Sequence, residues 1–247
     1  MNHEKEMIRT KDLTKKFGEK TAVDHLDLTI HEGELFSLLG VNGAGKTTTI
    51  RMLSCLSRPT SGEALVGGFS CLDHAEKVKE IIGISPQDTA VAERLTVQEN
   101  LSFMAALYTQ DKAVCRERTE RMIRLFHLEE VAGSQARTLS GGWKRKLSIA
   151  MAMIGEPQVL FLDEPTLGLD VLARRELWNL IGKLKEKRTI ILTTHYMEEA
   201  EQLSDRIAIM HRGRIRACGT LSEIETLAGV SGLENAFVEI AGKEELL

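Results

Sequence analysis

Long apolar runs are missing from this 247-residue sequence. Stretches free of Asp, Glu, Lys and Arg do not exceed 11 residues, as between Leu35 and Gly45, whereas a membrane-spanning helix needs about 20 apolar residues. The opening segment MNHEKEMIRTKD also lacks the apolar region of a secretory signal. We therefore expect a cytoplasmic protein that does not cross a bilayer by itself.

The sequence also has few cysteines and no excess of positive charge. The cysteines (Cys55, Cys71, Cys115 and Cys218) are widely separated and form no C-x-x-C pair, which predicts inert thiols rather than a zinc site or a disulfide. The 32 Lys and Arg residues against 36 Asp and Glu give a net charge of −4, so nucleic acid is not an expected partner. A hydrophobic share of 43% excludes a disordered chain and allows one large domain or two small ones.

Hydrophobic patterning predicts an α/β fold with a mostly parallel sheet. Leu26, Leu28 and Ile30 alternate with polar residues, as expected of a strand in a β-rich, antiparallel N-terminal region. Further along, short apolar runs alternate with helical patterns, which is typical of a parallel sheet. These runs are ELFSLL (34–39), VLFL (159–162) and TIILTT (189–194). Arg212-Gly213, between two short strand patterns, indicates a hairpin turn.

A helical insertion is predicted between two parts of this core. Thr96-x-x-Glu99 is a capping-box pattern that starts one helix. A second helix carries four arginines, for which a solvated face is favoured over phosphate binding. They are Arg116, Arg118, Arg121 and Arg124. We place one domain at 1–220, its core at about 1–88 and 157–220, its helical insertion at about 89–156, and a short C-terminal extension at 221–247.

The most specific motif is a complete phosphate-binding loop, G-x-x-x-x-G-K-[ST], with a predicted strand before it and a helix after it. It consists of Gly40, Val41, Asn42, Gly43, Ala44, Gly45, Lys46 and Thr47. Glycines let successive backbone N–H groups surround a phosphate chain, and the following helix N-terminus favours anions. Lys46 would bind the β- and γ-phosphates, and the Thr47 hydroxyl would be a ligand of Mg²⁺. The motif predicts a P-loop NTPase core.

Two acids follow the apolar run VLFL directly. Asp163 and Glu164 therefore emerge at the carboxyl end of a strand, where α/β sheets bind ligands. Asp163 suits the coordination of Mg²⁺, and Glu164 suits the base that polarises a water molecule. Alone, this pair could equally be an acidic turn that caps a helix; beside a phosphate loop, it predicts the catalytic and metal-binding acids.

A second possible anion site precedes another helix. Ser140 is a good N-cap, and Gly141 and Gly142 expose backbone N–H groups where the helix begins near Trp143. An ordinary capped helix is the alternative interpretation. If both sites bind anions, the chain has two separate elements that can contact phosphate.

The motifs and their order resemble those of the ATP-binding-cassette (ABC) ATPases over nearly the whole chain. The matching segments are GVNGAGKT (40–47) for the Walker A loop, ISPQD with Gln87 for the Q-loop, LSGGW (139–143) with KRKL for the signature, VLFLDEP (159–165) for Walker B, Gly168-Leu169-Asp170 for the D-loop and His195 for the switch histidine. The resemblance implies a RecA-like core. The family usually has Gln where this chain has Trp143.

The resemblance also implies roles for single residues. Phe17 would stack on adenine, although an ordinary strand-end hydrophobe is the alternative. Thr48 and Asp170 would contact the nucleotide. Gln87 would touch Mg²⁺ and water, the alternative being a surface-loop residue. His195 follows TIILTT at the sheet edge where the γ-phosphate is expected, and it would join Glu164 and Lys46 as a catalytic residue.

As a whole, the resemblance implies an ATPase with ATP and Mg²⁺ as cofactors. In a head-to-tail homodimer, or a heterodimer with a related ATPase, Ser140 and Gly142 of one subunit would face the γ-phosphate held by Lys46 of the other. A separate transmembrane permease is implied, which would place the chain on the inner face of the cell membrane as a peripheral subunit. The segments GLDVLARRELWNLI and TTHYMEEAEQLSDRIAIMHRGRI resemble exporter ATPases that serve ABC-2-type permeases for drugs or lipids.

Other functions remain open alternatives. The main one is a non-transport ABC ATPase that acts on a ribosome or on DNA, which is disfavoured by the single Walker A loop and by the lack of a long coiled coil between Lys46 and Ser140. A small-molecule P-loop kinase would leave the signature and His195 unexplained. A binding module without turnover is disfavoured by the intact Glu164. The extension at 221–247 could be regulatory, a dimer contact, or a terminal strand and tail.

Overall fold

Two β-sheets form the framework of the computed structural model, which describes residues 5–185 and 188–242. The larger sheet consists of β3 (Leu35–Leu39), β6 (Ile82–Ser85), β7 (Val159–Asp163), β8 (Thr189–Thr194), β9 (Arg206–His211) and β10 (Arg214–Gly219). Its strand order is β10-β9-β3-β8-β7-β6. All neighbouring pairs are parallel except β9 and β10, which are antiparallel, so the predicted mostly parallel sheet is confirmed.

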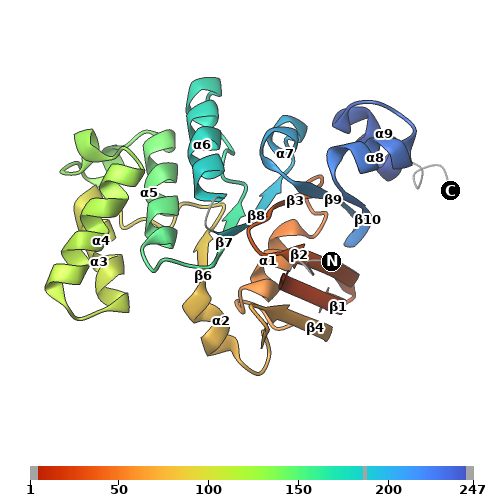
Figure 1. Cartoon of the computed structure of the whole chain (residues 1–247), viewed down its shortest axis with the longest axis horizontal. Coiled ribbons are helices and arrows are strands. Elements are labelled where there is room, and N and C mark those ends of the chain that lie inside the picture. The colour runs from red at the N-terminus through yellow and green to blue at the C-terminus, as the bar shows by residue number, and fades with distance from the viewer. Residues whose placement is uncertain (1–4, 186–187, 243–247) are drawn as a thin grey trace.

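The smaller sheet lies beside the larger one and is antiparallel (Figure 1). It consists of β1 (Glu6–Phe17), β2 (Lys20–His31), β4 (Ser61–Val66) and β5 (Phe69–Ser70), in the order β2-β1-β4-β5. Leu26, Leu28 and Ile30 of β2 are buried, as their alternation predicts. The antiparallel N-terminal region is therefore confirmed.

The apolar runs of the sequence form the centre of the larger sheet. β3, β7 and β8 are buried at every residue, as expected of strands that are covered on both faces. The turn between β9 and β10 contains Arg212 and Gly213, both with positive φ (47° and 82°), which is the backbone of a tight hairpin. The carboxyl ends of β3, β7 and β8 meet at one edge of the sheet, where the functional side chains gather.

The segment predicted as an insertion forms three helices and two short 3₁₀ turns. These are α3 (Val97–Tyr108), α4 (Lys112–Leu125), η1 (Glu129–Val131), η2 (Ala136–Thr138) and α5 (Gly141–Met153). Figure 1 shows α3 and α4 at one end of the molecule, with α5 between them and the larger sheet. The capping box of Thr96 and Glu99 is present at the start of α3.

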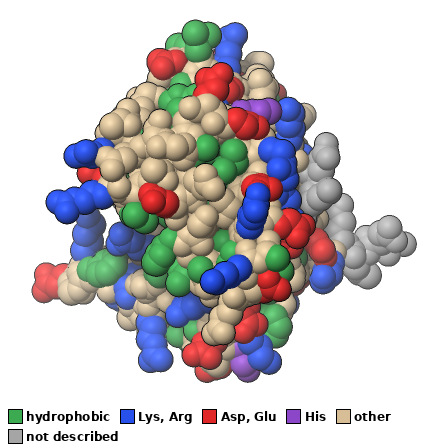
Figure 2. Space-filling view, turned by 90° about the vertical axis from the view of Figure 1, so that its left-hand side faces the viewer, with side chains coloured by type: hydrophobic (Ala, Val, Ile, Leu, Met, Phe, Trp, Pro, Cys, Tyr) green, Lys and Arg blue, Asp and Glu red, His purple; other side chains and the backbone are tan. Residues whose placement is uncertain are grey.

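The arginines of α4 lie on a solvated face. Arg116 and Arg124 both pair with Glu120 of the same helix, and Arg121 pairs with Glu156. Figure 2, which views this end of the molecule, shows acidic and basic side chains interspersed rather than a single basic patch. The preference for a solvated face over a phosphate site is consistent with these pairs.

The remaining helices cover the two sheets. They are α1 (Lys46–Leu53), α2 (Ala75–Ile81), α6 (Val171–Leu184), α7 (Met197–Leu203), α8 (Leu221–Ala228) and α9 (Leu233–Gly242). One apolar cluster joins α1 to both sheets, and a second joins helices α3 to α6 to the other face of the larger sheet. Apolar burial of this kind is the main stabilising term of such a fold, and it fixes α1 against the strand ends.

The C-terminal segment is helical, so its interpretation as a terminal strand is wrong. Leu233, Ala236 and Phe237 are buried at helical spacing on α9 and pack with Ile207 and Ile209 of β9. Residues 243–247, the tail of that interpretation, lie outside the described residues. No helix in the described parts of the chain combines the length and apolar character needed to span a membrane.

Candidate functional site

The phosphate loop connects β3 to α1 and requires glycine. Gly45 is the N-cap of α1 with φ 112°, and a Cβ there would lie 2.5 Å from the carbonyl oxygen of Ala22. At Gly40, a Cβ would lie 2.3 Å from the carbonyl oxygen of Met210. Because glycine alone fits these positions, the backbone N–H groups at the start of α1 are positioned close to a ligand.

Lys46 is almost fully buried, with its ammonium directed back over the loop. Its Nζ donates to the carbonyl oxygens of Gly40 (2.7 Å) and Val41 (3.2 Å). It also lies 3.1 Å from Oε1 of Glu164, and the two side chains are only 6% and 5% exposed. Removing either partner of such a buried ion pair would strongly destabilise the protein, because it would leave the other charge buried and unpaired.

Asp163 and Thr47 meet at the end of β7. Asp163 Oδ1 accepts hydrogen bonds from the hydroxyls of Thr47 (3.1 Å) and Thr193 (2.5 Å). Thr193 pairs directly with Asp163 across β7 and β8. A carboxylate beside a hydroxyl supplies the oxygen ligands that Mg²⁺ prefers, so this donor set fits the predicted metal site.

Glu164 contacts His195 as well as Lys46. His195 Nδ1 lies 2.7 Å from Oε2 of Glu164. The backbone of Glu164 has φ 49°, an uncommon conformation for a non-glycine residue and one that concentrates at functional sites. Its N–H donates to the carbonyl (3.1 Å) and the hydroxyl (3.0 Å) of Thr193. The carboxylate is therefore held between two cationic or hydrogen-bonding groups.

Gln87 is held by a buried arginine from α5. Arg145 donates to the backbone carbonyls of Pro86 (2.8 Å) and Gln87 (2.7 Å). Burial lowers the pKa of Arg145, whereas the nearby negative charges of Asp163 and Asp88 act to raise it. The backbone of the Q-loop is thus tied to the helix that follows the second predicted anion site.

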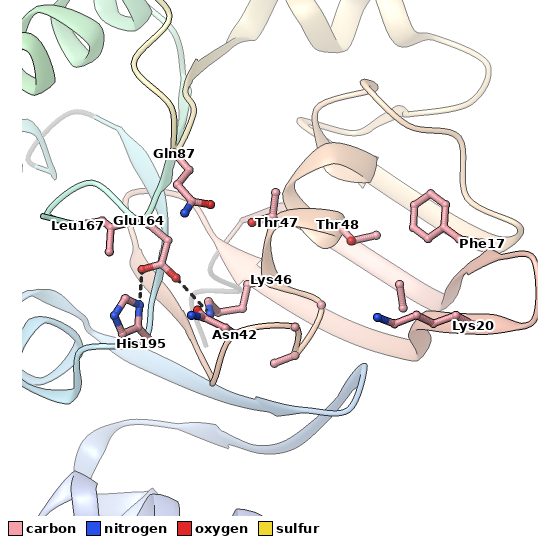
Figure 3. A pocket seen from close by; sticks show the side chains of 14 residues that line it. Phe17, Lys20, Asn42, Lys46, Thr47, Thr48, Gln87, Glu164, Leu167 and His195 are labelled. Carbon is pink, nitrogen blue, oxygen red and sulfur yellow. Dashed lines mark hydrogen bonds and ion pairs between the residues drawn. The ribbon is translucent and has the colours of Figure 1, made fainter.

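Several of these residues line one cavity of about 450 Å³, which is drawn in Figure 3, whereas the predicted site residues Gly40, Val41 and Asp163 do not line it. Glu164, His195, Gln87 and Lys46 lie at one end, and Phe17, a residue that is 55% exposed, lies at the other. The remaining predicted lining residues are Asn42, Gly43, Ala44, Gly45, Thr47 and Thr48. An exposed ring at one end and a phosphate loop at the other suit a nucleotide, which has an aromatic base and an anionic tail.

The sequence did not predict every residue of the cavity. The cavity is also lined by Lys20, Ala22 and Leu167. The Thr193 hydroxyl accepts the backbone N–H of Glu164 and donates to the carboxylate of Asp163. Lys20 could have been found because it pairs with Phe17 across the hairpin of β1 and β2. Thr193 is recognisable only once β7 and β8 are known to be neighbours in register.

The second predicted anion site lies apart from this cavity. Ser140 caps α5 through the backbone N–H of Trp143 (3.5 Å), and Asp170 caps α6 through the N–H groups of Leu172 (3.0 Å) and Ala173 (2.9 Å). Ser140, Gly142 and Asp170 line a different cavity of about 320 Å³. Two helix N-termini therefore meet at this second cavity, which the carboxylates of Asp170 and Glu176 also line.

Within one chain, the structure does not bring Ser140, Gly141, Gly142 or Asp170 to the cavity of Lys46. No residue lines both cavities in the described parts of the chain. Contact between Ser140 and a phosphate bound at Lys46 would thus require a second chain. Their role in nucleotide binding stays a prediction.

Known proteins resemble the chain over most of its length. A family model described as ABC transporter matches residues 23–167. The human phospholipid-transporting ATPase ABCA3 is 43% identical over 217 residues, which are 86% of this chain and 13% of that protein. The probable multidrug ABC transporter ATP-binding protein YbhF of Escherichia coli (strain K12) is 39% identical over 240 residues, which are 95% of this chain and 41% of that protein.

A solved structure shares the fold. The ATP-binding cassette MJ0796, in a dimeric post-hydrolysis state bound to ADP and Pi, has a TM-score of 0.79 and 28% identity, and the match covers 87% of this chain and 99% of that chain. This chain spans only 13% of the human protein and 41% of the Escherichia coli protein.

Proposed function

Because the chain belongs to the ABC transporter family, we propose that it binds MgATP in the cavity of Lys46 and hydrolyses it with Glu164 as the general base. The observation that carries this proposal is the position of Glu164. Its carboxylate lies at the phosphate end of the cavity, 3.1 Å from Lys46 and 2.7 Å from His195. A base that accepts a proton from water must lie within hydrogen-bond reach of the reacting group.

In the proposed complex, each end of the cavity binds one part of ATP. The Phe17 ring stacks on the adenine, and the backbone N–H groups of residues 42–48 bind the phosphates. Thr47, Asp163 and Gln87 are the groups that would hold Mg²⁺. The ion would neutralise charge on the β- and γ-phosphates.

The Lys46–Glu164 ion pair gives ATP binding a direct effect on the base. A γ-phosphate competes for the Lys46 ammonium, because Lys binds phosphate as a strong point charge. Glu164 Oε1 is then available to accept a proton from the attacking water, while Oε2 keeps its 2.7 Å contact with His195. His195 thus orients the carboxylate during the reaction.

We further propose a head-to-tail dimer, a homodimer or a heterodimer with a related ATPase. Ser140, Gly141, Gly142 and Asp170 of one subunit would complete the phosphate site of the other. The separation of the two cavities within one chain supports this arrangement. So does the exposure of large apolar side chains beside each cavity, at Val41 (47%) and Leu172 (81%). The dimeric state of MJ0796 is a further support.

As its biological role, we propose that the chain drives a separate transmembrane permease, as a peripheral subunit of an exporter. The family description and the names of the multidrug and phospholipid relatives support this role. A tagged chain recovered from the membrane fraction with a polypeptide of several membrane-spanning helices would test it. Recovery with ribosomes or DNA instead would favour the alternative of a non-transport ATPase.

Nucleotide binding is tested by Lys46→Ala. The change removes a charge-assisted contact worth about 1.5–3 kcal/mol, so ATP affinity should fall by roughly ten- to a hundredfold in a fluorescence titration. Lys112→Ala removes an exposed lysine at the start of α4 and should leave affinity unchanged. Equal affinity of Lys46→Ala and the parent would refute the proposed site.

A further inference from the structure

A buried carboxyl group lies behind the cavity and does not line it. Glu199, on α7, is 0% exposed. Its Oε1 accepts hydrogen bonds from the Thr166 hydroxyl (2.8 Å) and the Trp178 indole N–H (3.0 Å). Burial of a carboxyl group is costly unless it is hydrogen-bonded, so a side chain placed here needs a specific set of partners.

The partners of Glu199 belong to the segments that carry the proposed catalytic residues. Thr166 lies two positions after Glu164, in the turn closed by a hydrogen bond from Leu167 N–H to Glu164 O (3.2 Å). Thr194 directly precedes His195; its hydroxyl faces the Glu199 carboxyl and accepts the Tyr196 N–H (2.9 Å). Through Trp178, the same carboxyl also contacts α6. One side chain therefore connects the two segments that hold Glu164 and His195.

We propose that Glu199 is a positioning residue for ATP hydrolysis, which holds the turn after Glu164 and the strand end before His195 at a fixed separation. The inference rests on the proposed function of Glu164 and His195. Those two side chains contribute to catalysis only while their 2.7 Å contact persists. The φ of 49° at Glu164 also needs support from the surrounding structure, since such a conformation is strained for a residue other than glycine.

The environment of Glu199 favours the neutral form of its carboxyl group. Burial raises its pKa against the opposing effect of its hydrogen bonds, and the negative charge of Glu164 raises it as well. Oε2 is buried without a hydrogen-bond partner of normal geometry among the described residues, so a proton on Oε2 can be directed at the Thr194 hydroxyl.

The test compares Glu199→Gln with Glu199→Leu in the full chain, by kcat and KM for MgATP. Gln is neutral, accepts at Oε1 and donates from its amide nitrogen, so kcat should stay within about threefold of the parent. Leu has a similar size but no polar atom, so kcat should fall by about tenfold or more through misplacement of the base. KM should change little in both. The exposed neighbour Glu198→Leu is the matched control and should behave as the parent.

Parental kcat in a folded Glu199→Leu variant would overturn the inference, as would an equal loss in Glu199→Gln. If Glu199→Leu fails to fold, Thr166→Val decides: a severalfold lower kcat at unchanged KM supports the inference, and parental kcat overturns it. Hydrolysis by the parent must first exceed that of Lys46→Ala. If it does not, the proposed function itself has failed, and this inference with it, which is a different result from parental kcat in Glu199→Leu.

Discussion

At the scale of single residues, Trp143 is the position where this chain departs from the usual family pattern. The ammonium group of Lys146 lies over the Trp143 ring, with Nζ 4.5 Å from the ring centroid. The same Nζ lies 2.6 Å from Oε1 of Glu176. These contacts hold the indole at the edge of the second cavity. The groups that we propose contact an anion there are the Ser140 hydroxyl and the backbone of Gly141 and Gly142, which the indole does not replace.

We therefore predict that Trp143→Gln retains ATPase activity within about tenfold of the parent, because backbone donors supply most of an anion contact at a helix N-terminus. Steady-state phosphate release is the measurement. Ser140→Ala is the comparison, since it removes a cap and a donor from the same site and should lower activity more. Complete inactivity of Trp143→Gln in a folded protein would show that the indole itself has a specific role.

The residues of the site differ in how far the sequence reveals them. Lys46 and Thr47 lie in one contiguous motif, and Asp163 and Glu164 follow a strand that is recognisable from its apolar run, so their common location is predictable. Thr193 and Glu199 are not predictable in this way. Their roles arise from the pairing of β7 with β8 and from the packing of α7, which bring together residues about 30 positions apart.

At the scale of elements, the geometry of the turn between β3 and α1 depends on Gly45. Its φ of 112° and the 2.5 Å approach of a Cβ to the Ala22 carbonyl oxygen leave no space for a side chain. The contact is with backbone of β2, which cannot rotate away as a side chain can. The phosphate loop is thus packed directly against the smaller sheet.

Gly45→Ala should therefore lower both the free energy of unfolding and ATP affinity. Gly33→Ala is a matched control, because Gly33 also has positive φ (78°) but a Cβ there meets nothing within 4 Å. The control should lower the free energy of unfolding by about 1–2 kcal/mol through backbone strain alone, and Gly45→Ala should lower it by more. Urea unfolding and ATP titration would measure the two effects, and equal unfolding free energies in both variants would contradict the steric argument.

Elements were predictable where one physical signal dominates. β7 and β8 appear as continuous apolar runs because both of their faces are buried. The short β5, only two residues long, has no comparable signal, whereas α8 begins at a capping box of Thr220 and Glu223. Helix α9 is specified by the packing of Leu233, Ala236 and Phe237 on β9 and neighbouring helices, which explains why a terminal strand was a reasonable but wrong interpretation.

At the scale of the whole molecule, the central feature is the separation of the two elements that we propose bind phosphate. Lys46 and the phosphate loop line one cavity, whereas Ser140 and Asp170 line another. The side chains of Val41, Val171 and Leu172 near these cavities are 47%, 63% and 81% exposed. We propose that ATP joins the cavity of one subunit to the second cavity of another and that hydrolysis separates them.

Glu164→Gln in size-exclusion chromatography with MgATP tests this proposal most directly. Gln is nearly isosteric and leaves Lys46, Thr47 and Asp163 to bind MgATP, but it cannot accept a proton from water. Hydrolysis should fall on the order of 10² to 10⁴-fold, and the variant should accumulate as a dimer with ATP but not with ADP, whereas the parent should not. A variant that stays monomeric in ATP, dimerises equally with ADP, or hydrolyses ATP at the parental rate would contradict the account.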